Sequence, residues 1–137
     1  MTTFSNGNPV LNPPASRQQL EAARQQVGRE LPRDLLTLWR SSDGLSFPAS
    51  GVVIYTAADI AERNVTYEVA AYAPALLLVG DDSGGSGFFV SAAGHATGVW
   101  KIDLGALGDT EGRQVGPSLL AWAQGGCPAG DPSPGDR

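Results

Sequence analysis

Apolar residues recur at helical spacing in the first part of the chain. Leu20, Ala23 and Val27 lie three and four residues apart, which places them on one face of a helix. Ser16 precedes them and stands three residues before a glutamine, the arrangement of a capping box. Gly28 follows and would end the helix. This pattern predicts a helix from residue 16 to about residue 28.

A second apolar stripe follows in the segment LPRDLLTLWRSSDGLSF. Pro32 suits the first turn of a helix, where its missing N–H has no intrahelical partner. Leu35, Leu38 and Trp39 then fall on one face. Gly44 can adopt the left-handed conformation that ends a helix. We therefore expect a second helix, with an apolar face that covers a sheet.

After Gly44 the apolar spacing changes from the helical period to alternation. β-Branched and aromatic residues concentrate in five segments that we interpret as strands, at residues 45–47, 51–55, 76–82, 87–91 and 98–103. The connections 83–86 and 92–97 are short, and such short connections join antiparallel neighbours. Thr56 and Asp59 indicate a short helix to about Asn64, whereas residues 67–75 are ambiguous.

The chain ends with one more helix and a tail. Residues 105–116 form a glycine-rich loop, and a helix follows from Pro117 with Leu119, Leu120 and Trp122 on it. The order of elements predicts an α+β fold: an antiparallel sheet covered on one face by an N-terminal helix pair and a C-terminal helix. We expect a flexible arm at 1–14, a single domain at 15–125 and a disordered tail at 126–137.

Large aromatic residues are expected in the core. Trp39, Trp100 and Trp122 each stand in an apolar periodic segment, and such side chains dominate core burial. In the strand at 98–103, Trp100 and Ile102 point one way and their neighbours the other. An aromatic ligand cage is the weaker interpretation of the tryptophans.

The charge and hydropathy of the chain argue against two classes of function, nucleic-acid binding and membrane insertion. The chain has 137 residues, a net charge of −5 and a pI of about 4.6, and Lys101 is its only lysine. Binding of nucleic acid normally requires a basic face, so nucleic acid is not an expected partner. The N-terminus lacks a basic start and an apolar segment, and no apolar run is long enough to span a membrane. We therefore expect a cytoplasmic protein.

The chain has too few cysteine and histidine residues for a disulfide or a typical zinc site. Cys127 is the only cysteine, so no intramolecular disulfide forms, and its Gly/Pro-rich surroundings predict a solvated thiol. His95 is the only histidine. A zinc site needs about four ligands, so neither a metal nor another cofactor is expected.

One string imitates a serine nucleophile. Asp82-Ser83-Gly84-Gly85 matches the sequence around the catalytic serine of trypsin-like proteases. A serine nucleophile needs a positioned base. His95 follows the serine, whereas that family's histidine precedes it. The chain is also too short for a double barrel, so we interpret the string as a hairpin turn.

The segment from Gly80 to Gly87 also imitates a phosphate-binding loop. Such a loop needs a lysine next and then a helix N-terminus. Here the segment leads instead into Phe88 and a predicted strand. A small enzyme or phosphate binder that uses this loop is therefore a remote alternative.

Acidic residues offer a surface for a partner rather than an acid–base pair. Asp81 and Asp82 are neighbours on a strand end, so their side chains point to opposite faces. An acidic patch on the rim of the sheet is the functional interpretation. Its candidate partner-binding residues are Asp43, Asp59, Glu62, Glu68, Asp81, Asp82 and Gly84.

Several segments together resemble the SUKH superfamily, in the branch that contains the yeast cell-wall assembly regulator domain. They are Leu31-Pro32-Arg33-Asp34-Leu35 with Leu38 and Asp43-Gly44; Leu78-Val79-Gly80 with Gly84, Gly85 and Gly87; Gly98-Val99-Trp100 with Asp103; and Ser118-Leu119-Leu120 with Trp122. The resemblance spans residues 16–124. It departs at Phe88, where the family often has a polar residue, and at 67–75, which match nothing.

The resemblance implies a domain that binds proteins and catalyses nothing. Bacterial members look like immunity proteins that neutralise a cognate toxin by occluding its active site, and an acidic inhibitor suits a basic toxin domain. The alternative is an intracellular scaffold or regulatory domain, like the eukaryotic members. The matched residues are then structural: Pro32, Leu35, Leu38, Trp39, Gly44, Gly80, Gly87, Trp100 and Trp122. The oligomeric state stays open.

Overall fold

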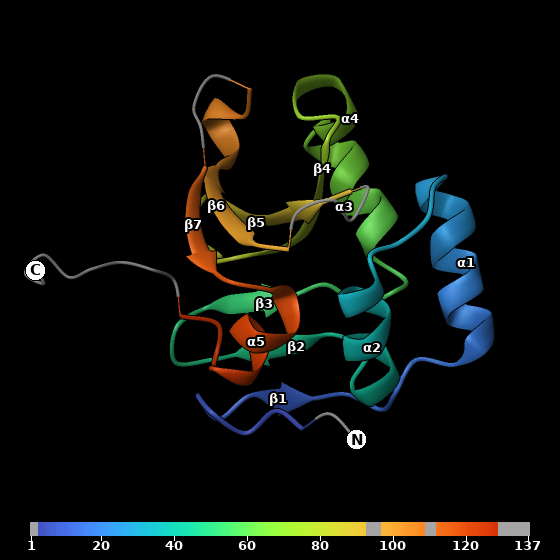
Figure 1. Cartoon of the computed structure of the whole chain (residues 1–137), viewed down its shortest axis with the longest axis vertical. Helices are drawn as coiled ribbons and strands as arrows, with labels where there is room; N and C mark the ends of the chain where they lie inside the picture. Colours follow the sequence, from blue (N-terminus) through green and yellow to red (C-terminus); the bar gives the residue numbers. More distant parts are fainter. Residues whose placement is uncertain (1–2, 93–96, 109–111, 129–137) are drawn as a thin grey trace, which may run out of the picture.

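A meander of antiparallel strands forms the centre of the molecule (Figure 1). The computed structural model describes residues 3–92, 97–108 and 112–128. Within these ranges, seven strands pair in chain order: β1 (Val10–Leu11), β2 (Leu45–Phe47), β3 (Val52–Ile54), β4 (Leu76–Asp81), β5 (Ser86–Ser91), β6 (Val99–Asp103) and β7 (Arg113–Gly116). The helices are α1 (Arg17–Val27), α2 (Arg33–Ser41), α3 (Ile60–Thr66), α4 (Val69–Tyr72) and α5 (Leu119–Gln124), with a 3-10 turn η1 (Leu104–Ala106). The predicted α+β fold is confirmed.

The N-terminal helix pair forms as its local signals predict. The Ser16 hydroxyl accepts a hydrogen bond from the Gln19 amide at 3.1 Å, and the Gln19 side chain accepts one from the Ser16 amide at 2.7 Å. This reciprocal pair is a capping box. Gly28 ends α1 in the left-handed region, at φ 86°. The expected boundaries of α1 are therefore confirmed.

The apolar stripe of α2 is fully buried. Leu35, Leu38 and Trp39 are each 0% exposed. The Trp39 indole N–H also donates to the backbone carbonyl of Tyr55 at 2.9 Å, which ties α2 to the end of β3. Gly44 follows at φ 87°, where a Cβ would lie 2.9 Å from the Ile54 carbonyl oxygen. Both the positive φ and the close approach to the Ile54 carbonyl require glycine at this position.

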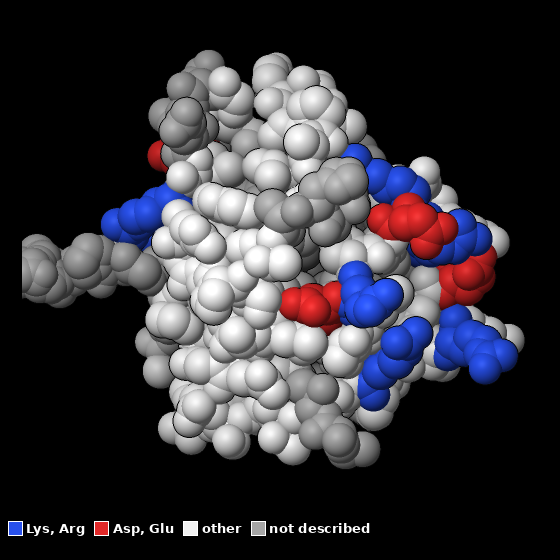
Figure 2. Space-filling view, in the orientation of Figure 1, with Lys and Arg blue, Asp and Glu red and all other residues white. Residues whose placement is uncertain are grey.

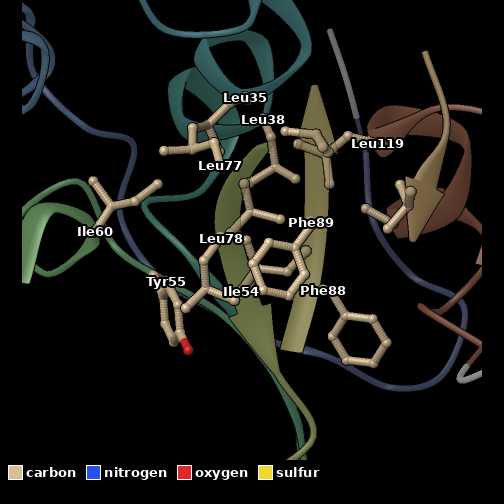
Figure 3. Packing of buried hydrophobic residues seen from close by; sticks show 14 of the residues in the cluster. Leu35, Leu38, Ile54, Tyr55, Ile60, Leu77, Leu78, Phe88, Phe89 and Leu119 are labelled. Atoms are coloured by element: carbon tan, nitrogen blue, oxygen red, sulfur yellow. The ribbon is translucent and has the colours of Figure 1, made fainter. Parts of the chain in front are cut away.

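The two faces of the sheet have different cover. Phe88 of β5 packs against Trp122 of α5, with ring centroids 4.7 Å apart. We call the side of Phe88 and Val90 the α5 face. Phe89 lies opposite Trp100 in the β5–β6 register, so both point to the other side, which we call the Trp100 face. Figure 3 shows the packing, with Leu35 and Leu38 pointing from α2 toward the strands.

Strand β4 is irregular where β3 joins it. Its register against β5 shifts between Leu78 and Gly80. A Cβ on Gly80 would lie 2.2 Å from the Val53 carbonyl oxygen, so only glycine lets β3 approach this closely. Ahead of the shift, the Asn64 side chain of α3 pairs with both the N–H and the C=O of Leu78. A side-chain amide therefore takes the place of a neighbouring strand.

Part of the segment 1–14, which we expected to be a disordered or loosely docked arm, makes defined contacts with the fold. Phe4 is 5% exposed, and β1 pairs with β2. The Asn6 side chain donates to the Gln124 carbonyl at 2.8 Å, which links the first described residues to α5. A two-residue strand leaves no periodic signal, and the burial of Phe4 depends on distant segments. The sequence pattern therefore missed both.

The expectation of a solvated thiol at the start of the tail is wrong. Cys127 is 1% exposed rather than solvated, because the chain turns back after α5. Its amide donates to the Trp122 carbonyl at 2.9 Å, and the Trp122 indole donates to the Pro128 carbonyl at 2.8 Å. Burial raises the pKa of the Cys127 thiol. The expected tail from residue 129 onward lies outside the described residues, as does His95.

Trp39 and Trp122 occupy the core as predicted, but Trp100 does not. Trp100 is half-buried on the face away from α5, although Phe89 and Ile102 on the same face are buried. Two segments without a clear sequence signal also hold regular structure. The ambiguous residues 67–75 contain α4, and the expected loop 105–116 contains β7.

Candidate functional site

The connection between β4 and β5 is an acidic turn that its own side chains hold in place. We define the acidic turn as residues 81–86. One carboxylate oxygen of Asp82 accepts hydrogen bonds from the amides of Gly84 at 2.8 Å and Ser86 at 3.0 Å. Ser83 and Gly85 adopt positive φ angles of 62° and 104°. The turn therefore has a defined shape although residues 83–85 are exposed.

Asp81 anchors the base of the acidic turn. One of its oxygens accepts from the Ser83 amide at 2.9 Å, and the other accepts from the Tyr55 hydroxyl at 2.6 Å. Burial of the Tyr55 ring, followed by its hydrogen bond to Asp81, raises the pKa of the phenol. The Ser83 hydroxyl donates to the Gly51 carbonyl at 2.7 Å and ties the acidic turn to the β2–β3 turn.

Asp103 brings another carboxylate to the same end of the sheet. It is the last residue of β6 and lies opposite Ser86 in the register. Its carboxylate accepts from the Gly105 amide at 2.8 Å, and the next amide, of Leu104, donates to the Gly85 carbonyl at 2.8 Å. The candidate list from the sequence missed Asp103. The predicted antiparallel pairing was the available signal, because it places the end of β6 beside the start of β5.

The other predicted acids lie elsewhere, so the structure does not form one continuous patch from the candidates. The Asp43 carboxylate accepts from the Ala57 amide at 2.7 Å, at the end of β3 away from the acidic turn. Asp59 and Glu62 belong to the start of α3, and Glu68 precedes α4 at φ 55°. Sequence distance gave no means of separating these groups.

Arg63 of α3 interacts with two neighbouring side chains, Glu62 and Tyr67. The Arg63 guanidinium binds Glu62 at 2.7 and 2.8 Å and lies 6.0 Å from the centre of the Tyr67 ring. The hydrogen bond from Arg63 lowers the pKa of Glu62. Arg63 also lowers the pKa of Tyr55, although burial and Asp81 outweigh it. Tyr55 is therefore the residue that both Asp81 and Arg63 influence.

The geometry of the acidic turn weighs against its two enzyme-like interpretations. The Ser83 hydroxyl donates its proton to a backbone carbonyl rather than to a base. The amides of Gly84 and Ser86, which a phosphate loop would offer to an anion, already donate to the Asp82 carboxylate. The turn therefore presents negative charge where a phosphate-binding loop presents N–H groups. Within the described ranges, no group of three His, Cys, Asp or Glu side chains could hold a metal ion.

Charge is unevenly distributed along the chain. Basic residues dominate α1, α2 and their link, at Arg17, Arg24, Arg29, Arg33 and Arg40, among Glu21, Glu30 and Asp34. Acidic residues dominate the described part that follows, at Asp43, Asp59, Glu62, Glu68, Asp81, Asp82 and Asp103, among Arg63, Lys101 and Arg113. Figure 2 shows one face of the molecule, where most of the coloured side chains gather over α1 and α2.

Comparison with known proteins assigns no family. No protein-family model matches the chain, and no curated protein matches its sequence. In the part of the chain that the structure describes, no helix is both long and apolar enough to cross a membrane. The function must therefore be argued from the geometry of the site.

Proposed function

We propose that this chain is a non-catalytic protein-binding domain of the SUKH type that serves as an immunity protein in the cytoplasm. It would bind a cognate toxin domain and occlude the toxin's active site. The observation that carries the proposal is the acidic turn. Asp81, Asp82 and Asp103 gather at one end of the sheet, and backbone amides and Tyr55 fix their carboxylates.

A preformed acidic turn suits a basic protein partner. Binding normally costs the ordering of loops and side chains at the interface, and a loop already held by internal hydrogen bonds loses less freedom. Negative charge on the turn also attracts a basic surface over a distance of about 8 Å at physiological ionic strength. Such complementarity speeds association and fixes orientation. The acidic turn is both held in shape before binding and negatively charged.

The architecture supports the resemblance to the SUKH superfamily. The resemblance implies an α+β domain, and the four matched segments lie in α2, in the β4–β5 hairpin, in β6 and in α5. The matched residues Leu35, Leu38 and Trp39 serve the core, which leaves the exposed turn for a partner. We infer that the family-like segments build the scaffold while the acidic turn provides the interaction.

Co-expression with the toxin encoded beside this gene tests the proposal. We expect the chain to relieve that toxin's lethality and to copurify with it. The sharpest variant is Asp82→Asn, because the amide oxygen of asparagine can still accept the two turn hydrogen bonds while the charge is lost. We expect it to slow association by about tenfold at low salt. Glu30→Gln is the matched control, since Glu30 is exposed and lies between α1 and α2.

Two results would overturn the proposal. If no neighbouring toxin is neutralised and pull-downs return housekeeping proteins instead, the scaffold or regulatory alternative replaces it. If calorimetry shows tight binding of inorganic phosphate that Asp82→Asn strengthens, the loop is a phosphate site. Equal effects of Asp82→Asn and Glu30→Gln on toxin binding would remove the acidic turn from the interface.

A further inference from the structure

The two ends of the described chain meet beside the end of α5. The Asn6 side chain donates to the Gln124 carbonyl at 2.8 Å, although 118 positions separate the two residues in the sequence. A Cβ on Gly7 would lie 3.3 Å from the Gly126 Cα, and a Cβ on Gly126 would lie 3.2 Å from the Asn6 carbonyl oxygen. Figure 1 shows the N-terminal segment running past the end of α5. The backbones of the two segments are therefore in direct contact.

We call residues 4–7 and 124–128 the terminal clasp. It contains two side chains that are nearly inaccessible to solvent, since Phe4 is 5% exposed and Cys127 is 1% exposed. Cys127 has a φ of 53°, in the left-handed region that residues other than glycine seldom occupy. Such a conformation persists only where surrounding contacts hold it in place. The contacts across the terminal clasp are available to hold Cys127 in this conformation.

Most of the terminal clasp lies outside the helices and strands. Residues 4–7 precede β1 and residues 125–128 follow α5, so the two halves can separate without breaking the pairing of the described strands. Two hydrogen bonds return the C-terminal half to α5, from the Cys127 amide to the Trp122 carbonyl and from the Trp122 indole to the Pro128 carbonyl. Segments of this kind open with a lower free energy than the whole domain.

We propose that the terminal clasp opens as one unit while the sheet stays folded, and that this opening uncovers the Cys127 thiol. Each half holds the other, because the backbone contact between Gly7 and Gly126 is lost for both when either half leaves. The terminal clasp thus acts as a lid over the only thiol of the chain, and the thiol reacts in the open state alone. The terminal clasp contains no residue of the acidic turn, so its opening does not depend on the proposed function.

The rate at which Cys127 is labelled in the full chain measures the opening. The probe is dithiobis(nitrobenzoate): the thiolate attacks the disulfide of the reagent, forms a mixed disulfide and releases one coloured thiolate. Gly7→Ala is the sharpest variant, because Gly7 is remote from Cys127 in the sequence and has a φ of 82°. Opening of the terminal clasp relieves the strain of the added Cβ, so we expect labelling to become about tenfold faster.

Gly28→Ala is the matched control. Gly28 has a φ of 86°, close to that of Gly7, but a Cβ there would meet no described atom within 4 Å. Both variants strain the backbone of the folded chain, yet only global unfolding relieves the strain at Gly28. We therefore expect Gly28→Ala to be labelled at the rate of the parent protein. Equal acceleration in the two variants would show that Cys127 reacts through global unfolding, which would overturn the proposal.

The urea dependence of labelling separates local from global opening in the parent protein. Below the unfolding transition, the labelling rate should depend little on urea, because a local opening exposes little surface. A slope as steep as that of global unfolding would contradict the local opening.

A reciprocal experiment tests whether the two halves open together. Chymotrypsin cleaves after aromatic residues, and Phe4 is accessible to it only when the N-terminal half has opened. Gly126→Ala should therefore accelerate loss of the first four residues by about tenfold, measured by mass spectrometry, whereas Gly28→Ala should not. If Gly126→Ala leaves the cleavage rate unchanged, the two halves open separately and the terminal clasp is not one unit.

Discussion

Two tryptophans on opposite faces of the sheet experience different environments although their sequence contexts look alike. Trp122 lies on the α5 face, is 1% exposed and contacts Phe88. Trp100 lies on the other face, is half-buried and lines a cavity. Both stand in apolar segments with regular periodicity. In the described part of the chain, α2 and α5 cover one face, whereas α4 and the residues around η1 border the part of the other face around Trp100.

This comparison separates two kinds of information. Alternation along a strand tells which residues share a face. It does not tell which face the helices cover, because that depends on where α5 returns after β7. Both faces contribute buried residues, such as Phe88 on the α5 face and Phe89 on the other, but only the α5 face buries its tryptophan completely. We expect the acidic turn, rather than either face, to carry binding.

We expect the largest loss of stability from a substitution in the core on the α5 face. Trp122→Ala should lower the free energy of unfolding by about 3–5 kcal/mol, because it removes a fully buried ring. Urea unfolding followed by circular dichroism measures the change. The Cys127 thiol should also react faster with a thiol reagent, since Trp122 holds the segment that buries it. Trp39→Ala should destabilise to a similar extent and impair partner binding only through unfolding.

Trp100→Ala should have a smaller effect on the same measurement. We expect a loss of about 1–2 kcal/mol, since the side chain is already partly in contact with water and less apolar area is uncovered. A loss as large as that of Trp122→Ala would contradict the distinction between the two faces.

Tyr55→Phe tests the hydrogen bond beneath the acidic turn. We expect a loss of about 1–2 kcal/mol at pH 7, because the bond to Asp81 joins a phenol to a charged group. The parent protein should also lose stability as the pH rises above about 10, where the unfolded phenol ionises but the folded one keeps its proton. In the Tyr55→Phe variant, the part of this stability loss that comes from ionisation of Tyr55 should be absent. Urea midpoints between pH 7 and pH 11 provide the measurement.

Asp82→Asn should change stability least. Its amide oxygen can replace the carboxylate oxygen that accepts from Gly84 and Ser86, so we expect a loss of less than about 1 kcal/mol. Asp82→Ala, which removes both hydrogen bonds, should cost more. Thermal unfolding of the two variants checks this order, and equal losses would show that these bonds do not hold the turn.

Local signals predicted a large part of the fold. The capping box of Ser16 and Gln19, the stripe of α2 and the alternation around Phe88 each depend on residues a few positions apart. Strands β1 and β7 went unpredicted because they are short, and β7 includes the polar residues Arg113 and Gln114. Their pairing depends on neighbours that only the folded chain brings close.

The candidate site was only partly predictable for a similar reason. Asp81, Asp82 and Gly84 were expected to act together, and adjacency in the sequence sufficed to group them. Asp103 and Tyr55 joined them through strand pairing and a side-chain hydrogen bond. Asp43 is separated from them because it precedes β2, whose start pairs with the end of β3 away from the acidic turn. The separation of acidic residues along the sequence therefore does not predict which of them lie together in the folded chain.

The sequence by itself determined the order of α1, α2, β2 to β6, α3 and α5, the caps of the first helix and the residues that share a face of each predicted strand. These features arise from backbone sterics, hydrogen bonds and apolar periodicity within a few residues. Only the tertiary structure decided that Trp122 is buried and Trp100 is not, that Cys127 is covered, and that Asp103 adjoins the acidic turn. These outcomes depend on apolar burial and strand pairing between distant segments, whose free energy exists only once the chain has folded.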